Sequence, residues 1–204
     1  MIRPDAIVFD LGKVLVDFDY QIALRRLAPR STLSVEQLNP LLDQSPLLFR
    51  YESGQMTSMQ FYEAFRTASG FRGDFAEFGC LFSDIFTAIE PMIALHSELR
   101  SRGLRTFVFS NTNELQASHI RERFPFFRRF DGYILSFERG ALKPDLRLYE
   151  AVERITGCRG AGLFYIDDRP ENVAVGRARG WQAMVHEDPR RTRQQLCAAG
   201  LLTV

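Results

Sequence analysis

The sequence predicts an α/β fold: a doubly wound, Rossmann-like parallel sheet with a small helical cap inserted after its first strand. Short runs of β-branched and aromatic residues are typical of strands buried in a parallel sheet. Five such runs occupy residues 5–10, 104–109, 133–135, 163–166 and 181–185. After Pro91 these runs alternate with segments whose apolar residues recur at helical spacing, and such alternation specifies a parallel doubly wound sheet.

The first strand, residues 5–10, is separated from the others by a long segment of different character. Over residues 20–89 apolar side chains recur at helical spacing, and prolines and glycines break the pattern at short intervals. This pattern predicts four or five short helices with no strands between them, packed around the phenylalanines of the segment. We therefore expect a core made of residues 1–16 and 90–204, and a helical cap made of residues 17–89.

Four helices are expected between the later strands. They are predicted to span residues 92–102, 115–124, 146–155 and 171–179. Gly103, Gly157 and Gly180 follow three of them, and glycine often ends a helix because it adopts the left-handed conformation at no steric cost. Asp145 fits the N-cap or first turn of the helix that begins near Leu146.

The overall composition bears on partners and location. Acidic and basic residues leave a net charge of +1, which gives no indication of a nucleic-acid or membrane surface. No apolar run approaches membrane-spanning length, and the N-terminus lacks a signal peptide's apolar region. Cys80, Cys158 and Cys197 are odd in number and lack CxxC spacing, so reduced thiols are expected. We expect a cytoplasmic protein, monomeric by default, with no nucleic-acid or membrane partner.

Polar side chains follow three of the predicted strands. In chain order they are Asp10, then Ser110 and Asn111, then the adjacent acids Asp167 and Asp168. Ligands of open α/β sheets bind beyond the carboxyl ends of the strands, so these side chains are expected to share one crevice. Two adjacent acids at the end of a buried strand repel one another unless a cation or hydrogen-bond donors compensate. The sequence therefore predicts a functional site at this edge of the sheet.

Four segments, taken in chain order, resemble the motifs of the haloacid dehalogenase superfamily. They are Asp10-Leu11-Gly12-Lys13-Val14, Ser110-Asn111-Thr112-Asn113, Lys143-Pro144-Asp145 and Asp167-Asp168-Arg169-Pro170-Glu171-Asn172. The closest similarity is to the sugar-1-phosphate phosphatases, which act on substrates such as α-D-glucose 1-phosphate, and to the phosphatase domain of soluble epoxide hydrolases. The resemblance covers nearly the whole chain, and four motifs in the right order are far more specific than any one of them.

The resemblance implies a magnesium-dependent phosphatase that hydrolyses a small phosphorylated metabolite, in particular a sugar phosphate. Asp10 is then the nucleophile that forms an aspartyl-phosphate, which splits one difficult hydrolysis into two easier steps. Asp10, Asp168 and the backbone carbonyl of Gly12 would hold Mg²⁺, which offsets the repulsion between the anionic nucleophile and the phosphate.

The same resemblance implies roles for the remaining motif residues. Ser110 and the backbone N–H of Asn111 would hold phosphoryl oxygens at a strand-to-helix turn. Lys143 would assist catalysis and bind phosphate through its positive charge. Asp167 and Asn172 would orient these groups by hydrogen bonds. Only two of the 26 basic residues are lysines, and arginine does not replace a compact ammonium charge, so Lys143 carries added weight.

Gly12 departs from the pattern of the family. Most phosphatases of the superfamily carry an aspartate two residues after the nucleophile, which acts as general acid and base, a contribution typically worth ~10²–10⁴-fold in rate. Three compensations are open: a good leaving group such as the anomeric oxygen of a sugar 1-phosphate, a water or substrate hydroxyl in the space beside Gly12, or a contribution from Lys13 or Asp17. The sugar-1-phosphate phosphatases that the chain resembles also carry glycine here, which favours the first.

Two alternative functions remain open. One is a catalytically silent protein that binds phosphate esters, because the usual acid/base is absent at Gly12. The other is a metal-free haloacid dehalogenase in which Asp10 attacks carbon, although the acid pair Asp167-Asp168 fits a cation better. The three histidines, His96, His119 and His186, lack metal-ligand spacing and are interpreted as hydrogen-bonded or solvated side chains without a catalytic role.

Overall fold

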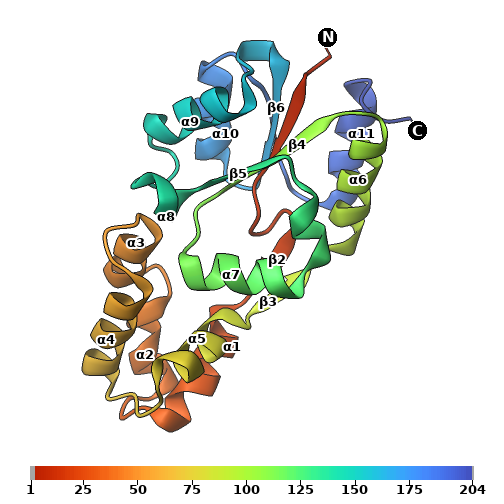
Figure 1. Cartoon of the computed structure of the whole chain (residues 1–204). Coiled ribbons are helices and arrows are strands. Elements are labelled where there is room, and N and C mark those ends of the chain that lie inside the picture. The colour runs from red at the N-terminus through yellow and green to blue at the C-terminus, as the bar shows by residue number, and fades with distance from the viewer. Residues whose placement is uncertain (1–2, 204) are drawn as a thin grey trace.

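The computed structural model describes residues 3–203, and its centre is a five-stranded parallel sheet (Figure 1). The strands are β1 (Ala6–Phe9), β4 (Arg105–Ser110), β5 (Gly132–Leu135), β6 (Leu163–Asp167) and β7 (Gln182–Val185). Their spatial order is β5-β4-β1-β6-β7, and all neighbours pair in parallel. Each strand coincides with a predicted run to within one residue at either end, which confirms the α/β fold.

The strand order places a crevice at one end of the sheet. From β1 the chain passes on to β4 on one side, whereas from β6 it passes on to β7 on the other side. Ligands of such sheets bind where the connections diverge, outside the carboxyl ends of the strands. Phe9 and Ile166 are register partners across β1 and β6, so the acids that follow them, Asp10 and Asp167, emerge side by side.

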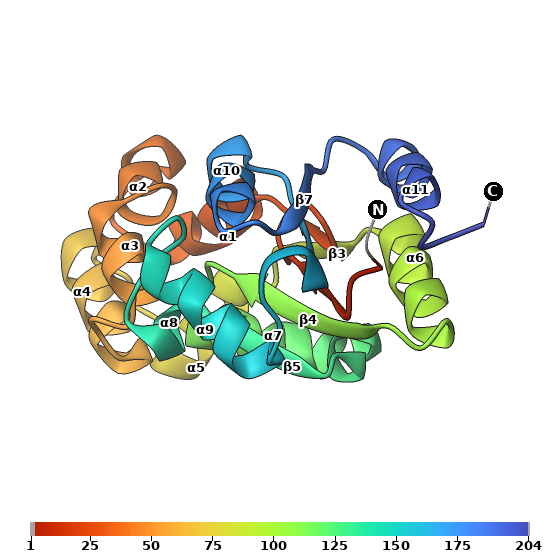
Figure 2. The same cartoon turned by 90° about the horizontal axis from the view of Figure 1, so that it is seen from above.

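Helices cover both faces of the sheet (Figure 2). One face is covered by α6 (Glu90–Ser101), α7 (Glu114–Arg123) and α11 (Pro189–Ala198), the other by α9 (Leu146–Thr156) and α10 (Pro170–Ala178). Side chains alternate along a strand, so Ile7 and Phe9 enter the first core while Ala6 and Val8 enter the second. The four predicted helices are confirmed, and Asp145 caps α9 by accepting a hydrogen bond from the N–H of Arg147 (2.9 Å).

The inserted helices form a cluster with its own hydrophobic core, beyond the end of the sheet at which β1 and β4 finish (Figure 1). They are α1 (Tyr20–Leu27), α2 (Val35–Leu42), α3 (Pro46–Glu52), α4 (Ser58–Ser69) and α5 (Phe75–Ser83). Five phenylalanines and five leucines are buried in this core, so most of the segment's phenylalanines are core residues, as predicted. The Phe61 ring stacks on Tyr51 at 4.5 Å between centroids, and Phe78 stacks on Phe82 at 5.5 Å. Such aromatic packing holds the short helices together.

A two-stranded antiparallel ribbon joins the helical cluster to the sheet. It consists of β2 (Val16–Phe18) and β3 (Phe86–Ala88), with Asp17 opposite Thr87. The five helices follow one another with no strand between them, as expected, but the sequence did not predict the ribbon that flanks them. Strands of three residues are too short to show a hydrophobic period, and these two pair because the two chain crossings between sheet and helices lie side by side.

Shorter elements complete the fold. They are α8 (Ser136–Arg139) and the 3₁₀ turns η1 (Ala28–Arg30), η2 (Pro125–Arg129) and η3 (Gly160–Gly162). Within residues 3–203, every helix is too short or too polar to cross a membrane.

Candidate active site

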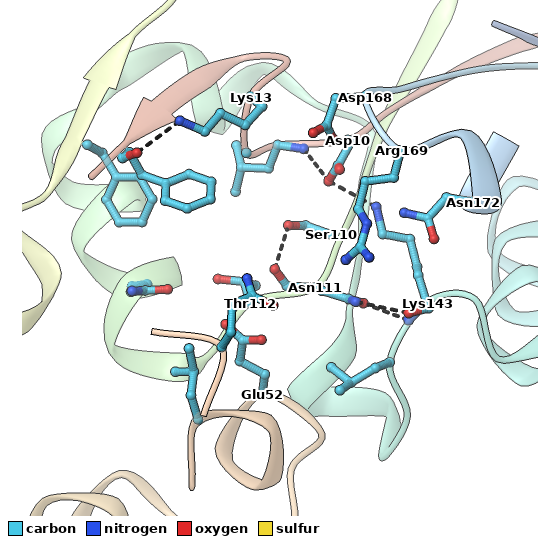
Figure 3. A pocket seen from close by; sticks show the side chains of 18 of the residues that line it. Asp10, Lys13, Glu52, Ser110, Asn111, Thr112, Lys143, Asp168, Arg169 and Asn172 are labelled. Carbon is cyan, nitrogen blue, oxygen red and sulfur yellow. Dashed lines mark hydrogen bonds and ion pairs between the residues drawn. The ribbon is translucent and has the colours of Figure 1, made fainter. Parts of the chain in front are cut away.

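A cavity of about 710 Å³ lies at the carboxyl ends of β1, β4 and β6, between the sheet and the inserted helices (Figure 3). Seven of the eight predicted site residues line it: Asp10, Gly12, Ser110, Asn111, Lys143, Asp168 and Asn172. The eighth, Asp167, is fully buried and is linked to the cavity through its hydrogen bonds with Lys143 and Asn172. The structure therefore brings together all the residues that the sequence motifs singled out.

Asp10 is held with one oxygen engaged and the other open. Its own N–H donates to the Ile166 carbonyl (2.8 Å), which fixes the residue beside β6. Oδ1 accepts from the Leu11 N–H (2.7 Å) and pairs with Nζ of Lys143 (3.0 Å), whereas no described residue donates to Oδ2. Burial raises the pKa of Asp10 well above its usual range, and the Lys143 charge opposes that shift. The ionised form of Asp10 therefore needs positive charge nearby.

Lys143 supplies part of that charge from a buried position. Its Nζ donates to Oδ2 of Asp167 (2.7 Å) and to the Phe109 carbonyl (3.0 Å), besides pairing with Asp10. Burial acts to lower the pKa of Lys143, but the two adjacent carboxylates more than offset it, and the net shift is upward. The lysine therefore stays charged between two acids.

Asp167 has both carboxylate oxygens occupied by protein donors. Oδ1 accepts from the Arg169 N–H (2.8 Å) and from Nδ2 of Asn172 (3.0 Å), while Oδ2 accepts from Lys143 and from the Tyr165 hydroxyl. Burial acts to raise the pKa of Asp167, but Lys143 and these donors outweigh it, so the pKa falls below its usual value. Asp167 is thus an ionised anchor for Lys143 and Asn172.

Asp168 is half-buried and faces the cavity without a donor from another described residue. Burial, followed by the charge of Asp167, raises its pKa. Asp10, Asp167 and Asp168 each offer a carboxylate oxygen within 4.8 Å of one another. Because Asp167 is saturated, Asp10 and Asp168 are the two that can bind a cation. Two carboxylates beside a cavity of this size fit Mg²⁺, which takes few protein ligands and keeps several waters.

Ser110 and Asn111 follow β4 at the same end of the sheet. The Ser110 hydroxyl is buried, 3% exposed, and donates to the Asn111 carbonyl (3.2 Å). The Asn111 amide binds the backbone of Lys143. The next N–H, that of Thr112, donates to the Ser136 hydroxyl (2.9 Å). The side chain of Asn111 is therefore committed to positioning Lys143, while Ser110 borders the cavity.

Phe18 fills the space beside Gly12. A Cβ on Gly12 would lie 2.8 Å from Cε1 of Phe18, closer than such contacts occur. This ring disfavours one of the three open compensations, a water or a substrate hydroxyl beside Gly12. Strand β2 brings the ring there, edge-on to Tyr20 with 5.9 Å between ring centroids.

Lys13 and Asp17 are paired with each other. The Lys13 ammonium donates to the Asp17 carboxylate and to the Phe18 carbonyl (3.0 Å), and it lies over the Phe18 ring, 4.7 Å from the centroid. Asp17 is exposed and does not line the cavity, whereas Lys13 does. Of these two candidates for the missing proton donor, only Lys13 borders the site, and its ammonium is already engaged.

Sequence reasoning missed the residues that close the cavity from the helical side. Tyr20 of α1, Leu48 and Glu52 of α3, and Phe86 of β3 line that wall. The Tyr20 hydroxyl accepts from Nε2 of Gln116 in α7 (3.0 Å), which ties the helical cluster to the core. The helical periodicity shows which residues are apolar but not which helix face meets the sheet, so no signal in the sequence identifies this wall.

The sheet, the inserted helices and three carboxylates gathered around one buried lysine define a Rossmann-like hydrolase. The chain belongs to the haloacid dehalogenase-like hydrolases: the sequence model of that family matches residues 4–180. This confirms the superfamily that the four motifs indicated.

Similar proteins come from fungi and bacteria. The sesquiterpene phosphatase astK of Aspergillus oryzae is 25% identical over 194 residues, which cover 94% of each chain. A haloacid dehalogenase family enzyme of Bacteroides thetaiotaomicron, solved with magnesium and inorganic phosphate, superposes with a TM-score of 0.79 at 20% identity, covering 90% of this chain and 94% of that one. The L-2-haloacid dehalogenase of Xanthobacter autotrophicus has a TM-score of 0.63 at 17% identity, covering 98% and 84%. These structural likenesses show the shared fold.

Proposed function

We propose that this protein is a magnesium-dependent phosphatase that hydrolyses a small phosphorylated metabolite, in particular a sugar phosphate, through an aspartyl-phosphate intermediate. The observation that carries the proposal is the state of Asp10. One of its oxygens is fixed by the Leu11 N–H and Lys143. The other receives no hydrogen bond from a described residue, and Asp10 lines the cavity next to Asp168. This is the geometry of a positioned carboxylate nucleophile beside a cation site.

Each residue of the site has a part in this chemistry. Asp10 attacks phosphorus, and the bond from phosphorus to the leaving group breaks; water then attacks the aspartyl-phosphate and releases phosphate. Asp10, Asp168 and the Gly12 carbonyl hold Mg²⁺, which when bound neutralises charge between the carboxylate and the phosphoryl group.

The remaining residues bind and orient the phosphoryl group. Ser110, the N–H of Asn111 and Lys143 hold its oxygens. Asp167 and Asn172 keep Lys143 in place, as their hydrogen bonds indicate. Two similar proteins support this choice: one is a phosphatase, and the other is an enzyme solved with magnesium and inorganic phosphate.

We further propose that residues 17–89 act as a cap that covers the cavity and selects the substrate. The segment has its own hydrophobic core, reaches the sheet through the β2–β3 ribbon, and supplies one wall of the cavity. A cavity of this volume can enclose a small phosphate ester. One copy of the chain supplies all the residues of the proposed site, so a monomer is sufficient.

Phe18 favours a second candidate function, a silent protein that binds phosphate esters. With its ring against Gly12, the usual position of the acid/base is closed. Against this candidate, Asp10, Lys143 and Asp168 are all retained. Asp168 also disfavours a metal-free dehalogenase. Without a cation, its carboxylate would lie uncompensated beside the nucleophile Asp10 and would repel it.

Phosphate release from a panel of sugar 1-phosphates and sugar 6-phosphates tests these functions. It is measured with magnesium, with chelator, and in Asp10→Asn. Magnesium-dependent release that disappears in the variant is the expected result, and preference for 1-phosphates would show that a good leaving group compensates for Gly12. Binding of the esters with no release from any of them would instead establish the silent binding protein.

A further inference from the structure

Hydrolysis of a phosphate ester with a basic leaving group needs a proton for the leaving oxygen, and the usual donor is absent from this site. Gly12 has no side chain, and Phe18 occupies the space in which one would lie. The Lys13 ammonium is bound to Asp17 and to the Phe18 carbonyl. Any donor must therefore come from another part of the cavity.

In-line geometry indicates where that donor lies. In phosphoryl transfer the attacking and leaving oxygens are roughly in line, on opposite sides of phosphorus. With Asp10 as the nucleophile, the leaving oxygen points away from β1 and toward the wall made by the inserted helices. Of the residues on that wall that line the cavity, Glu52 is the one carboxylic acid in the described part of the chain.

Glu52 projects into the cavity from the end of α3. Figure 3 shows it reaching toward the Ser110–Thr112 segment, on the opposite side of the pocket from Asp10 and Asp168. No hydrogen bond from a described residue engages its carboxyl group, so its proton is free to be shared with a ligand. It is the last residue of α3, at the helix end nearest to α8 and the sheet.

The end of α3 is fixed to the core, which gives Glu52 a defined position. The Glu52 carbonyl accepts from the Ser136 hydroxyl (2.7 Å). The neighbouring Tyr51 hydroxyl accepts from the Leu115 N–H (3.1 Å) and is bonded to Ser58 (2.7 Å). Because its own backbone and the neighbouring side chain are both hydrogen-bonded, Glu52 holds a fixed position relative to the site, as a catalytic group must.

Burial raises the pKa of Glu52 to about 7, so near neutral pH the group is present both as acid and as carboxylate. The titratable and charged groups that line the cavity with it are Tyr20 from α1, Lys13 after β1, Arg169 after β6, and Asp10, Lys143 and Asp168 at the sheet. None of these contributes to the shift, which comes from burial alone.

We propose that Glu52 is the proton donor to the leaving group, in place of the acid that Gly12 lacks. The inference rests on the proposed phosphatase function. As Asp10 bonds to phosphorus and the ester bond breaks, Glu52 gives its proton to the departing oxygen and becomes a carboxylate. In the second step that carboxylate takes a proton from water as the water oxygen bonds to phosphorus. The bond to Asp10 then breaks, and Glu52 is an acid again.

Leaving-group dependence tests this role. Phenyl phosphate and p-nitrophenyl phosphate have the same shape apart from the nitro group, but phenolate is much the more basic leaving group. Single-turnover release of the phenol is measured for the wild type and for Glu52→Gln. We expect the variant to lose roughly 10²-fold or more on phenyl phosphate and much less on p-nitrophenyl phosphate, because only the first needs the proton.

Two further variants separate the possible failures. Asp10→Asn should abolish release from both esters, and if it does not, the proposed function itself is wrong. Glu63→Gln changes a half-buried glutamate of α4 that pairs with Arg66 outside the cavity, and should leave both rates unchanged. Equal losses on both esters in Glu52→Gln, or no loss on either, would overturn the role of Glu52 while leaving the phosphatase intact.

Discussion

Asn111 and Lys143 hold their two loops together through a reciprocal pair of hydrogen bonds. The Lys143 N–H donates to Oδ1 of Asn111 (2.7 Å), and Nδ2 of Asn111 donates to the Lys143 carbonyl (3.2 Å). The loop after β4 thereby fixes the backbone from which the Lys143 ammonium reaches Asp10 and Asp167. The position of the buried charge depends on an amide that borders the cavity.

Asn111→Ala should therefore weaken phosphate binding as well as stability. Loss of two hydrogen bonds predicts a fall of about 1–3 kcal/mol in the free energy of unfolding. Urea denaturation and titration with inorganic phosphate measure the two effects. Asn39→Ala is the control, since Asn39 accepts a hydrogen bond from Gln21 within the helical cluster (3.1 Å) and should affect stability alone. Unchanged phosphate affinity in Asn111→Ala would refute the positioning role.

Lys143→Met should be strongly destabilising. Removing the cation leaves Asp10 and Asp167 buried and unpaired, which typically costs about 3–5 kcal/mol. The loss should be larger at pH 7.5 than at pH 5, because without the lysine the pKa of each acid rises and protonation relieves the repulsion. Lys13→Met, which removes the other, exposed lysine, should cost no more than about 1 kcal/mol. Denaturation curves at both pH values measure the free energy of unfolding of each variant. Equal losses of stability in Lys143→Met and Lys13→Met would contradict the buried pairing of Lys143.

Mg²⁺ should stabilise the folded protein through Asp10 and Asp168. A ligand present at 100 times its dissociation constant stabilises by about 2.7 kcal/mol, which appears as a higher melting temperature. Asp168→Asn should abolish most of that rise. Asp84→Asn, which changes an exposed acid paired with Arg26, should retain it. A full magnesium response in Asp168→Asn would show that the cation binds elsewhere.

Gly12→Asp alone should not restore a proton donor. Its Cβ would collide with Phe18, and such overpacking costs about 1–3 kcal/mol. Phe18→Ala opens the space, so the double variant should be more stable than the sum of the two single changes predicts, by about 0.5–3 kcal/mol. A double-mutant cycle from urea denaturation measures this coupling. Strict additivity would mean that the ring moves aside at no cost.

Glu52 should make stability fall as pH rises. Its pKa is raised from 4.5 to about 7 in the folded protein, so between these values the folded state binds more protons than the unfolded state. Stability is then lost as pH increases through this window. Glu52→Gln removes the penalty and should be more stable than the wild type at pH 8, by about 1–3 kcal/mol, but not at pH 4. Melting temperatures of the wild type and of Glu52→Gln, measured from pH 4 to pH 8, test this. A constant difference between them across that range would contradict the raised pKa of Glu52.

The sheet and the gathering of its acids could be predicted because both follow from local patterns. Each strand is a short buried run, and the carboxyl ends of parallel strands meet, so Asp10 and Asp168 could be placed together without a structure. The saturation of Asp167 could not be foreseen, since its donors Lys143, Tyr165 and Asn172 depend on side-chain directions.

The residues of the cavity wall formed by the inserted helices could not be predicted from the sequence, for a different reason. Glu52 and Phe18 lie where the helical cluster faces the sheet. The spacing of apolar residues along the sequence does not show how the helical cluster packs against the sheet, so the positions of these two side chains could not be predicted. The β2–β3 ribbon, which sets that meeting, is made of strands too short to recognise. Phe18 lies six residues from Gly12 in the chain, yet only the ribbon brings its ring there.

The ribbon also bears on how such a chain can diversify. Both ends of the inserted segment leave the sheet through adjacent strands, with Asp17 opposite Thr87, so a different set of helices could be grafted on at a single paired attachment. Such an exchange would also change the surroundings of the nucleophile. Because Phe18 belongs to the attachment and packs on Gly12, a new insertion brings its own residue to the neighbourhood of the nucleophile. Under the proposed roles of the cap and of Glu52, an exchanged insertion would change substrate choice and proton supply together.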